Sequence, residues 1–254
     1  MKKNKQSHRR NFLRKTLWGT GLFMGLPGFV SSQSKPGRKL YAKPGKVLLF
    51  QGDSITDARR NKKDNQPNTP HGLGSGYVNL IASELLGQNV QSDLNIYNRG
   101  ISGNKVFQLA DRWQADCLDI QPDVLTILIG VNDFWHKMKH GYKGTVAIYE
   151  SDYRKLLEQT LADLPEVQLI LCEPFMIPGG TAIEEGWPEA FAKYQEKARG
   201  IAKEFNARFI PYQRIFDEAL EDAEVSYWCP DGVHPGPAGN YLMAQAWLDV
   251  YKDG

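Results

Sequence analysis

The chain has 254 residues, of which 41% are apolar and 24% are charged, a balance typical of soluble globular proteins. This composition excludes an intrinsically disordered chain and a polytopic membrane protein. The length allows one or two domains, and the formal net charge of +2 is spread unevenly, because no Asp or Glu precedes Asp53.

The first 32 residues predict an export signal. Seven cations lie within residues 1–15, and a glycine-broken apolar stretch of 14 residues follows at 17–30. That stretch is too short to cross the roughly 30 Å hydrocarbon core of a bilayer as a helix. The pair Arg9-Arg10 resembles the twin-arginine motif, which implies export across the inner membrane to the periplasm or the medium. A disordered basic tail that binds anionic partners is the alternative.

Cleavage after Ser32 would leave a short extension, residues 33–45, and a single domain over residues 46–254. The shortened chain would carry 24 cations and 29 carboxylates, a net charge of −5. That charge gives no electrostatic support to nucleic-acid binding. We therefore expect neither a nucleic-acid partner nor an integral membrane segment. The oligomeric state is left open, a homo-oligomer included.

From Lys46 onward, short apolar runs alternate with longer segments of helical periodicity. The runs are mostly unalternated and rich in aliphatic residues, as expected for strands that are covered on both faces. Five strands joined by crossover helices indicate an α/β fold with a parallel, doubly wound sheet. We predict strands at 47–50, 94–97, 124–129, 167–171 and 208–211, helices at 77–86, 106–113, 148–164, 187–205 and 238–251, and functional loops at 61–76 and 177–186.

In such a sheet, ligands bind beyond the carboxyl ends of the strands. Ser54 follows the first predicted strand, Gly103 the second and Asn132 the third, while Asp231 and His234 lie in the last loop. Each residue alone is compatible with an ordinary cap, turn or loop role. Their joint occurrence in this order supplies the parts of an acyl-transfer site.

A serine hydroxyl is a poor nucleophile until a base takes its proton, and a neutral imidazole suits that task near pH 7. His234 is the candidate base for Ser54, and Asp231 is close enough in the chain to orient the imidazole. The oxyanion that forms needs preorganised donors. The backbone N–H groups of Ser54 and Gly103 and the side-chain amide of Asn132 are the candidates.

Four blocks of the sequence resemble those of the SGNH, or GDSL, hydrolase superfamily: Gly52-Asp53-Ser54, Gly103, Gly130-Val131-Asn132-Asp133 and Asp231-Gly232-Val233-His234. The resemblance covers about residues 46–251. It implies a flavodoxin-like three-layer α/β/α sandwich with a five-stranded parallel sheet. It also implies a catalytic triad of Ser54, His234 and Asp231, oxyanion donors at Ser54, Gly103 and Asn132, and no cofactor. The first block lacks the second glycine of G-x-S-x-G, which argues against the α/β-hydrolase fold.

The stretches around these blocks resemble the SGNH acetylxylan esterases, which implies an exported serine esterase that removes small acyl groups, acetyl above all, from carbohydrate. A lysophospholipase or a broad acylhydrolase or arylesterase with the same triad is the alternative, so the partner is a small-acyl ester of carbohydrate or lipid. A carbohydrate-binding protein on the same fold is the alternative outside enzymes. Trp135 and Trp228 flank the blocks and are candidates for stacking on sugar rings. The alternative is that both rings line the protein core or an oligomer interface.

Other motifs favour structural interpretations. His136 and His140 have helical spacing but lack the glutamate of H-E-x-x-H and a third ligand, so we expect no metal site. The glycine-rich run 72–76 does not follow a strand directly, which argues against nucleotide binding. Three carboxylates are interpreted as braces of the loops around Ser54 and Asn132 rather than as the acids of a glycosidase. These are Asp53, Asp57 and Asp133. With three cysteines and no C-x-x-C motif a disulfide framework is not expected, and Cys229 is predicted to be partly exposed.

Overall fold

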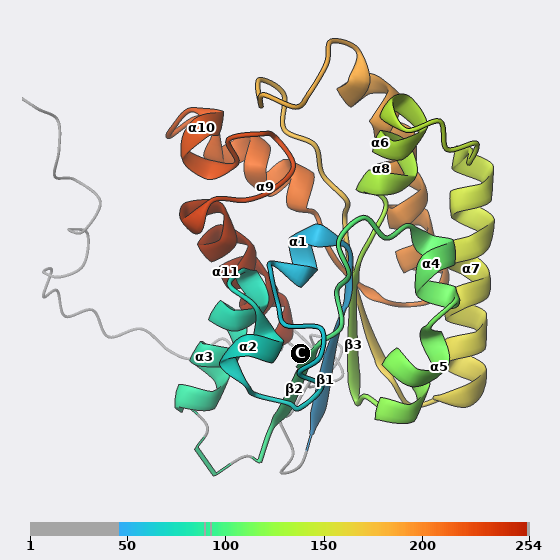
Figure 1. The fold of residues 1–254 in the computed structure, drawn as a ribbon, viewed down its shortest axis with the longest axis vertical. Coiled ribbons are helices and arrows are strands. Elements are labelled where there is room, and N and C mark those ends of the chain that lie inside the picture. The colour runs from blue at the N-terminus through green and yellow to red at the C-terminus, as the bar shows by residue number, and fades with distance from the viewer. Residues whose placement is uncertain (1–45, 89, 92, 253–254) are drawn as a thin grey trace, which may run out of the picture. The chain divides into compact units, whose positions relative to one another are not determined.

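Five parallel strands form one sheet in the order β2-β1-β3-β4-β5 (Figure 1). The structure is a computed structural model that describes residues 46–252 except 89 and 92. The strands lie within two residues of the predicted positions, and all four pairings are parallel. This confirms the predicted α/β class. Their bounds are β1 Val47–Gly52, β2 Asn95–Asn98, β3 Val124–Leu128, β4 Gln168–Cys172 and β5 Arg208–Ile210.

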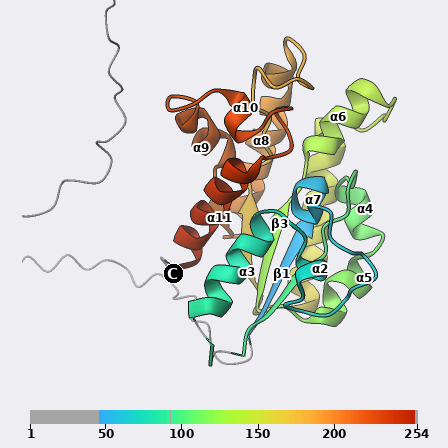
Figure 2. The ribbon, with the colours of Figure 1, turned by 60° about the vertical axis from the view of Figure 1, so that its left-hand side comes forward.

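Helices cover both faces of the sheet, which gives the three-layer, flavodoxin-like sandwich (Figure 2). On one face α3 (Tyr77–Gln88) packs against α11 (Pro237–Lys252). On the other face lie α4 (Val106–Ala110), α5 (Trp113–Asp116), α7 (Val146–Asp163) and α8 (Trp187–Glu204). The remaining helical elements are α1 Ser54–Asp57, α2 Pro70–Leu73, η1 Leu118–Ile120, α6 Val131–Lys139, α9 Tyr212–Ala219 and α10 Val225–Trp228.

The middle of the sheet is buried on both sides, which explains why its strands show no polar alternation. All five residues of β3 are buried. Helix α7 turns an apolar face inward, and Tyr149, Tyr153 and Leu157 on it are nearly fully buried. Its first turn is capped by Thr145, whose hydroxyl accepts a hydrogen bond from the N–H of Ile148 at 3.2 Å. The same pattern of strand and helix places the loops that carry chemistry at one edge of the sheet.

Some predicted elements differ from the structure. The single helix expected at 106–113 is divided into α4 and α5, because the chain leaves helical geometry at Arg112, where φ is −120° and ψ is 9°. Helices α6, α9 and α10 and the single-turn elements α1, α2 and η1 were not predicted. Each of them is at most nine residues long, too short for a clear helical periodicity.

The predicted export signal at 1–32 and the extension at 33–45 lie outside the described residues, so these boundaries stay predictions. Within residues 46–252, apart from the two gaps, no helix is long and apolar enough to cross a membrane.

Candidate active site

The first three sequence blocks lie at the carboxyl ends of three neighbouring strands. Strand β1 is central and is paired with β2 on one side and with β3 on the other. Ser54 follows β1, Gly103 follows β2 and Asn132 follows β3. The segments that carry Gly103 and Asn132 are joined directly. The side-chain amide of Asn132 donates a hydrogen bond to the carbonyl oxygen of Asn104, the residue after Gly103, at 3.2 Å.

Ser54 is the first residue of α1, directly after the strand. The carboxylate of Asp53 caps this short helix by accepting a hydrogen bond from the N–H of Ile55 at 3.0 Å. First-turn N–H groups have no partner within a helix, so that of Ser54 is available to another acceptor. Among the residues that the structure describes, none accepts a hydrogen bond from it.

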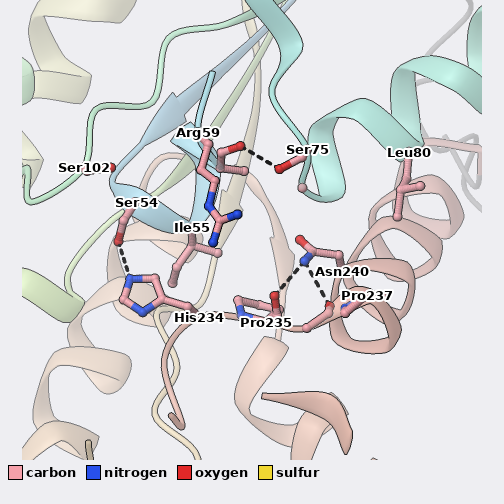
Figure 3. Close-up of a pocket in the computed structure, with 13 residues that line it drawn as sticks. Ser54, Ile55, Arg59, Ser75, Leu80, Ser102, His234, Pro235, Pro237 and Asn240 are labelled. Carbon is pink, nitrogen blue, oxygen red and sulfur yellow. Dashed lines mark hydrogen bonds between the residues drawn. The ribbon is translucent and has the colours of Figure 1, made fainter. Parts of the chain in front are cut away.

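A chain of hydrogen bonds joins Ser54, His234 and Asp231. The hydroxyl oxygen of Ser54 lies 2.7 Å from Nε2 of His234 (Figure 3). Nδ1 of His234 lies 2.7 Å from a carboxylate oxygen of Asp231. An ionised carboxylate can only accept, so Nδ1 carries the proton and Nε2 is free to accept from the serine hydroxyl. The His234 side chain is 43% exposed, which leaves it accessible to a substrate.

The Asp231 carboxylate also fixes the loop that carries the histidine. Its second oxygen accepts hydrogen bonds from the N–H groups of Val233 at 2.8 Å and His234 at 2.7 Å. Burial alone would raise the pKa of Asp231, but these bonds and the imidazole lower it to about 2. The bond to Asp231 in turn raises the pKa of His234 above 6.5, against the opposing effect of burial. The arrangement therefore suits an imidazole that must take up a proton.

The predicted functional loop at 177–186 is hydrogen-bonded through its backbone to the loop that carries Asp231 and His234, here called the histidine loop. The N–H of Ile177 donates to the carbonyl of Gly232 at 2.8 Å, and the N–H of Ala182 donates to that of Asp231 at 3.1 Å. A third backbone bond joins Thr181 to the carbonyl of Pro230 at 3.1 Å. These contacts give the loop a positioning role that its composition does not reveal.

On the other side of Ser54, the segment 102–104 presents Gly103 in a left-handed conformation. Its φ is +83°, a value that side chains disfavour, and a Cβ there would face Cε1 of His136 at 3.7 Å. Within the described part of the chain, no group accepts a hydrogen bond from the N–H of Gly103. Asn132 uses one amide hydrogen on Asn104 and retains the other. The three candidate donors, the N–H groups of Ser54 and Gly103 and the Asn132 amide, thus follow the ends of three neighbouring strands.

Asp57 holds this segment in place. It accepts hydrogen bonds from both the N–H and the hydroxyl of Ser102, at 2.9 and 2.6 Å, and pairs with Lys62 at 2.7 Å. Burial acts to raise its pKa, but the bonds from Lys62 and Ser102 lower it below its usual value. The predicted bracing role of Asp57 has this structural basis.

Two more carboxyl groups are buried near the site. Burial raises the pKa of Asp53 to about 7 and that of Asp133 to about 8. The N–H of Ile55 and the charge of His234 oppose the effect at Asp53, and the N–H of Val106 and the charge of Lys105 oppose it at Asp133. In each, one carboxyl oxygen is buried without a hydrogen-bond partner among the described residues. Both groups therefore retain a proton well above the usual range for Asp.

A pocket of about 660 Å³ opens beside Ser54 and His234 (Figure 3). Arg59, Ser75, Leu80 and Asn240 contribute to its wall. Its size is within the range of small-molecule sites and much larger than an acetyl group.

The two tryptophans occupy different places. The ring of Trp135, on α6, lies 6.1 Å from that of His234, centroid to centroid. Trp228 ends α10, packs edge-on against Tyr227 at 5.0 Å and does not line the pocket. Both are partly buried against the core. Trp135 does not line the pocket either, but its contact with His234 places it nearer to the triad than Trp228.

The other motifs have structural surroundings. Nδ1 of His136 lies 3.0 Å from the Lys105 ammonium, so that nitrogen accepts a hydrogen bond. Within the described residues, no group of three or more His, Cys, Asp or Glu is arranged to hold a metal ion. The three cysteines are free. Cys229 is fully buried, which corrects the expected partial exposure, because it packs into the core beneath the histidine loop.

Sequence reasoning missed part of the pocket wall. Ser75 belongs to the glycine-rich run at 72–76, whose sequence argued against nucleotide binding and indicated no other role. Arg59 and Leu80 stand in no motif, and Asn240 lies in the last helix, so no local pattern marks them. Only the packing of α1, α3 and α11 around one space brings them together.

Comparison with known proteins extends this description. The GDSL-like Lipase/Acylhydrolase family model matches residues 50–242. A relative, the acetylxylan esterase of Geobacillus stearothermophilus, is 32% identical over 206 residues, which are 80% of this chain and 93% of the relative.

Solved structures agree with that match. A protein of the GDSL-like lipase type from Parabacteroides merdae is 50% identical, with a TM-score of 0.82 over 84% of this chain and 98% of that one. The crystal structure of the G. stearothermophilus acetylxylan esterase is 31% identical, with a TM-score of 0.74 over 83% of this chain and 95% of that one. Variants of that esterase at one serine and at one aspartate are described as catalytic mutants.

Proposed function

The chain belongs to the GDSL-like lipase/acylhydrolase family and is a carboxylic ester hydrolase, and from that premise we propose that it removes small acyl groups, acetyl above all, from carbohydrate through a triad of Ser54, His234 and Asp231. The observation that carries the proposal is the continuous chain of hydrogen bonds from Ser54 through His234 to Asp231. The likeness to an acetylxylan esterase supports the choice of acyl group and of alcohol.

The reaction begins when His234 takes the hydroxyl proton of Ser54 as the serine oxygen attacks the ester carbonyl. Asp231 keeps the imidazole in the required tautomer and stabilises the imidazolium that forms. The N–H groups of Ser54 and Gly103 and the Asn132 amide donate to the developing oxyanion. The tetrahedral intermediate then collapses, and His234 passes the proton to the leaving alcohol oxygen.

Deacylation repeats these steps with water. His234 removes a proton from a water molecule, whose oxygen attacks the acyl-enzyme carbonyl, and the same three donors stabilise the second oxyanion. Collapse releases the carboxylic acid and returns the proton to Ser54. The reaction steps use only the side chains and backbone N–H groups named above and water.

The wall of the pocket supports a substrate that carries hydroxyl groups. Three serines, Arg59 and Asn240 contribute polar groups to it. The Trp135 ring, 6.1 Å from the His234 ring, offers an aromatic face of the kind that packs on sugar rings. Export through the twin-arginine-like signal at 1–32 would bring the enzyme to extracellular polysaccharide.

The test compares two substrates on the full chain. Acetate release from acetylated xylo-oligosaccharides is measured beside fatty-acid release from a lysophospholipid, with Ser54→Ala as the control for both. We expect acetate release that disappears in Ser54→Ala. Fatty-acid release alone would keep the triad and make the protein a lysophospholipase, and no turnover of either ester would overturn the proposal.

A further inference from the structure

The pocket beside Ser54 has an unbalanced charge. Among the residues that line it, Arg59 is the single Lys or Arg, and none is Asp or Glu. Arg59 is exposed, and no described residue forms a hydrogen bond or an ion pair with its guanidinium. Figure 3 shows that side chain beside Ile55, between the turn after α1 and the helix that carries Asn240. A permanent cation therefore faces the pocket, and no anion among the described residues pairs with it.

The backbone that carries Arg59 is held in an unusual conformation. Ala58 and Arg59 both have positive φ, at 42° and 63°, which non-glycine residues rarely adopt and which costs free energy. The carbonyl of Ala58 accepts hydrogen bonds from the N–H and the hydroxyl of Ser75, at 2.9 and 3.0 Å. The N–H of Arg60 is bound by the Asp57 carbonyl at 2.9 Å. The turn is thus fixed on both sides of Arg59, while the side chain of Arg59 has no hydrogen-bond or ion-pair partner in the described part of the chain.

The glycine-rich run at 72–76 makes this arrangement possible. A Cβ on Gly76 would lie 2.6 Å from the Cβ of Ala58 and 3.1 Å from Oδ1 of Asn240, both too close. A side chain at this position would crowd the turn that carries Arg59 and the helix that carries Asn240. Gly76 therefore allows these parts of the pocket wall to pack closely.

The pocket is within reach of the leaving alcohol in the proposed reaction. His234, Pro235 and Gly236 form part of its wall, and His234 must pass its proton to the alcohol oxygen. Asn240 donates to the carbonyls of Pro235 and Gly236 at 2.8 and 3.0 Å, so its amide orientation is fixed and Oδ1 remains as an acceptor for a hydroxyl group. A sugar bound here would have its substituents next to Arg59.

We propose that this pocket is a subsite for an alcohol that carries an anionic substituent, a sugar carboxylate as in a uronic acid, with Arg59 as the residue that recognises the anion. The inference rests on the proposed function and narrows its substrate from acetylated carbohydrate in general to acidic acetylated oligosaccharides. A guanidinium donates two parallel hydrogen bonds to a carboxylate, and a free one in a pocket without carboxylates is complementary to such a ligand. The phosphate of a glycerol ester shares this chemistry, and the test separates the two sources.

The experiment measures acetate release by the full chain from three esters: an acetylated xylo-oligosaccharide that carries a uronic acid, its neutral counterpart, and acetylglycerol phosphate. We compare wild type with Arg59→Ala, Arg59→Lys and the control Arg214→Ala, an exposed arginine on α9 that does not line the pocket. In Arg59→Ala the ratio of kcat/KM for the acidic over the neutral oligosaccharide falls roughly five- to tenfold, mainly through KM. Arg59→Lys retains part of the ratio, and Arg214→Ala retains all of it.

The ratio compares two substrates on one enzyme preparation, so partial misfolding of a variant does not alter it. An effect larger on acetylglycerol phosphate than on the acidic sugar would assign the anion to a phosphate ester. A second outcome is that kcat/KM for each anionic ester relative to the neutral oligosaccharide is the same in Arg59→Ala as in wild type, while acetate is still released from the neutral oligosaccharide. That result would overturn the subsite and leave the proposed function standing. No release from any of the three by wild type would overturn both.

Discussion

Asp57 accepts two hydrogen bonds from Ser102, one from its N–H at 2.9 Å and one from its hydroxyl at 2.6 Å, although 45 residues separate them in the chain. These bonds connect the helix that begins at Ser54 with the segment that carries Gly103. The Ser54 hydroxyl and the Gly103 N–H are thereby held relative to each other. This is the relation that attack and oxyanion stabilisation both require.

Removal of this link should slow the chemistry without changing its acid–base groups. We expect Asp57→Ala to lower kcat by roughly 10- to 100-fold, because small displacements of a donor are costly. Ser102→Ala keeps the backbone bond and should have a much smaller effect. Steady-state kinetics over pH check this, and a shifted acid limb in Asp57→Ala would argue that Asp57 acts on His234 instead.

The pKa of His234 predicts the pH dependence. The enzyme needs a neutral imidazole, and the bond to Asp231 raises the His234 pKa, so kcat/KM should fall as pH decreases through a value above 6.5. Asp231→Asn removes the negative charge that raises the pKa of His234. The acid limb should then move to lower pH, and the plateau should drop by about 10³-fold or more, though less than in His234→Ala. A limb that stays in place would exclude Asp231 as the orienting group.

Asn132 should matter for the transition state rather than for binding. Asn132→Ala removes one donor to the oxyanion and should lower kcat by roughly 100-fold with little change in KM. The bond to the Asn104 carbonyl is lost as well, so thermal unfolding of the variant is measured in parallel. An unchanged kcat in a stably folded Asn132→Ala protein would remove Asn132 from this role.

Asp133 predicts a pH-dependent stability. With a folded-state pKa of about 8 and an ordinary value of 3.8, its carboxyl binds a proton in the folded state that the unfolded chain has released. Between these limits the folded state holds more protons, so its free energy of unfolding decreases as pH rises. Asp133→Asn removes this cost. It should match wild type near pH 4 and exceed it at pH 8 by about 1 kcal/mol or more.

Urea unfolding at both pH values measures this difference. Asp222→Asn, at an exposed position, is the matched control and should show no such difference. Equal unfolding free energies of wild type and Asp133→Asn at pH 8 would show that Asp133 is ionised in the folded state at little cost.

Much of the fold follows from local sequence. Continuous apolar runs locate the five strands within two residues, because burial on both faces removes polar alternation. The same logic does not find α9 or α10, which are short. It does not find α6 either, which begins at Val131, inside a block whose Asn132 and Asp133 are also compatible with a cap or a turn.

The features of the site also differ in whether the sequence predicts them. Ser54 is recognisable because motif and strand end coincide, and Asp231 and His234 because they share one motif in the last loop. The structure brings the three into contact. The bond between Asp57 and Ser102, the exposure of Arg59 and the separation of Trp228 from the pocket depend on contacts between distant segments. The buried state of Cys229 belongs with them, because its place beneath the histidine loop is decided by packing and not by its neighbours in sequence.

The most direct test of the account is covalent labelling of the nucleophile. A fluorophosphonate ester, which reacts with activated serines, is incubated with the full chain, and the adduct is located by peptide mass spectrometry. The account predicts one adduct, on Ser54, formed in wild type and absent in His234→Ala. An adduct on another serine, or full ester hydrolysis by Ser54→Ala, would contradict it.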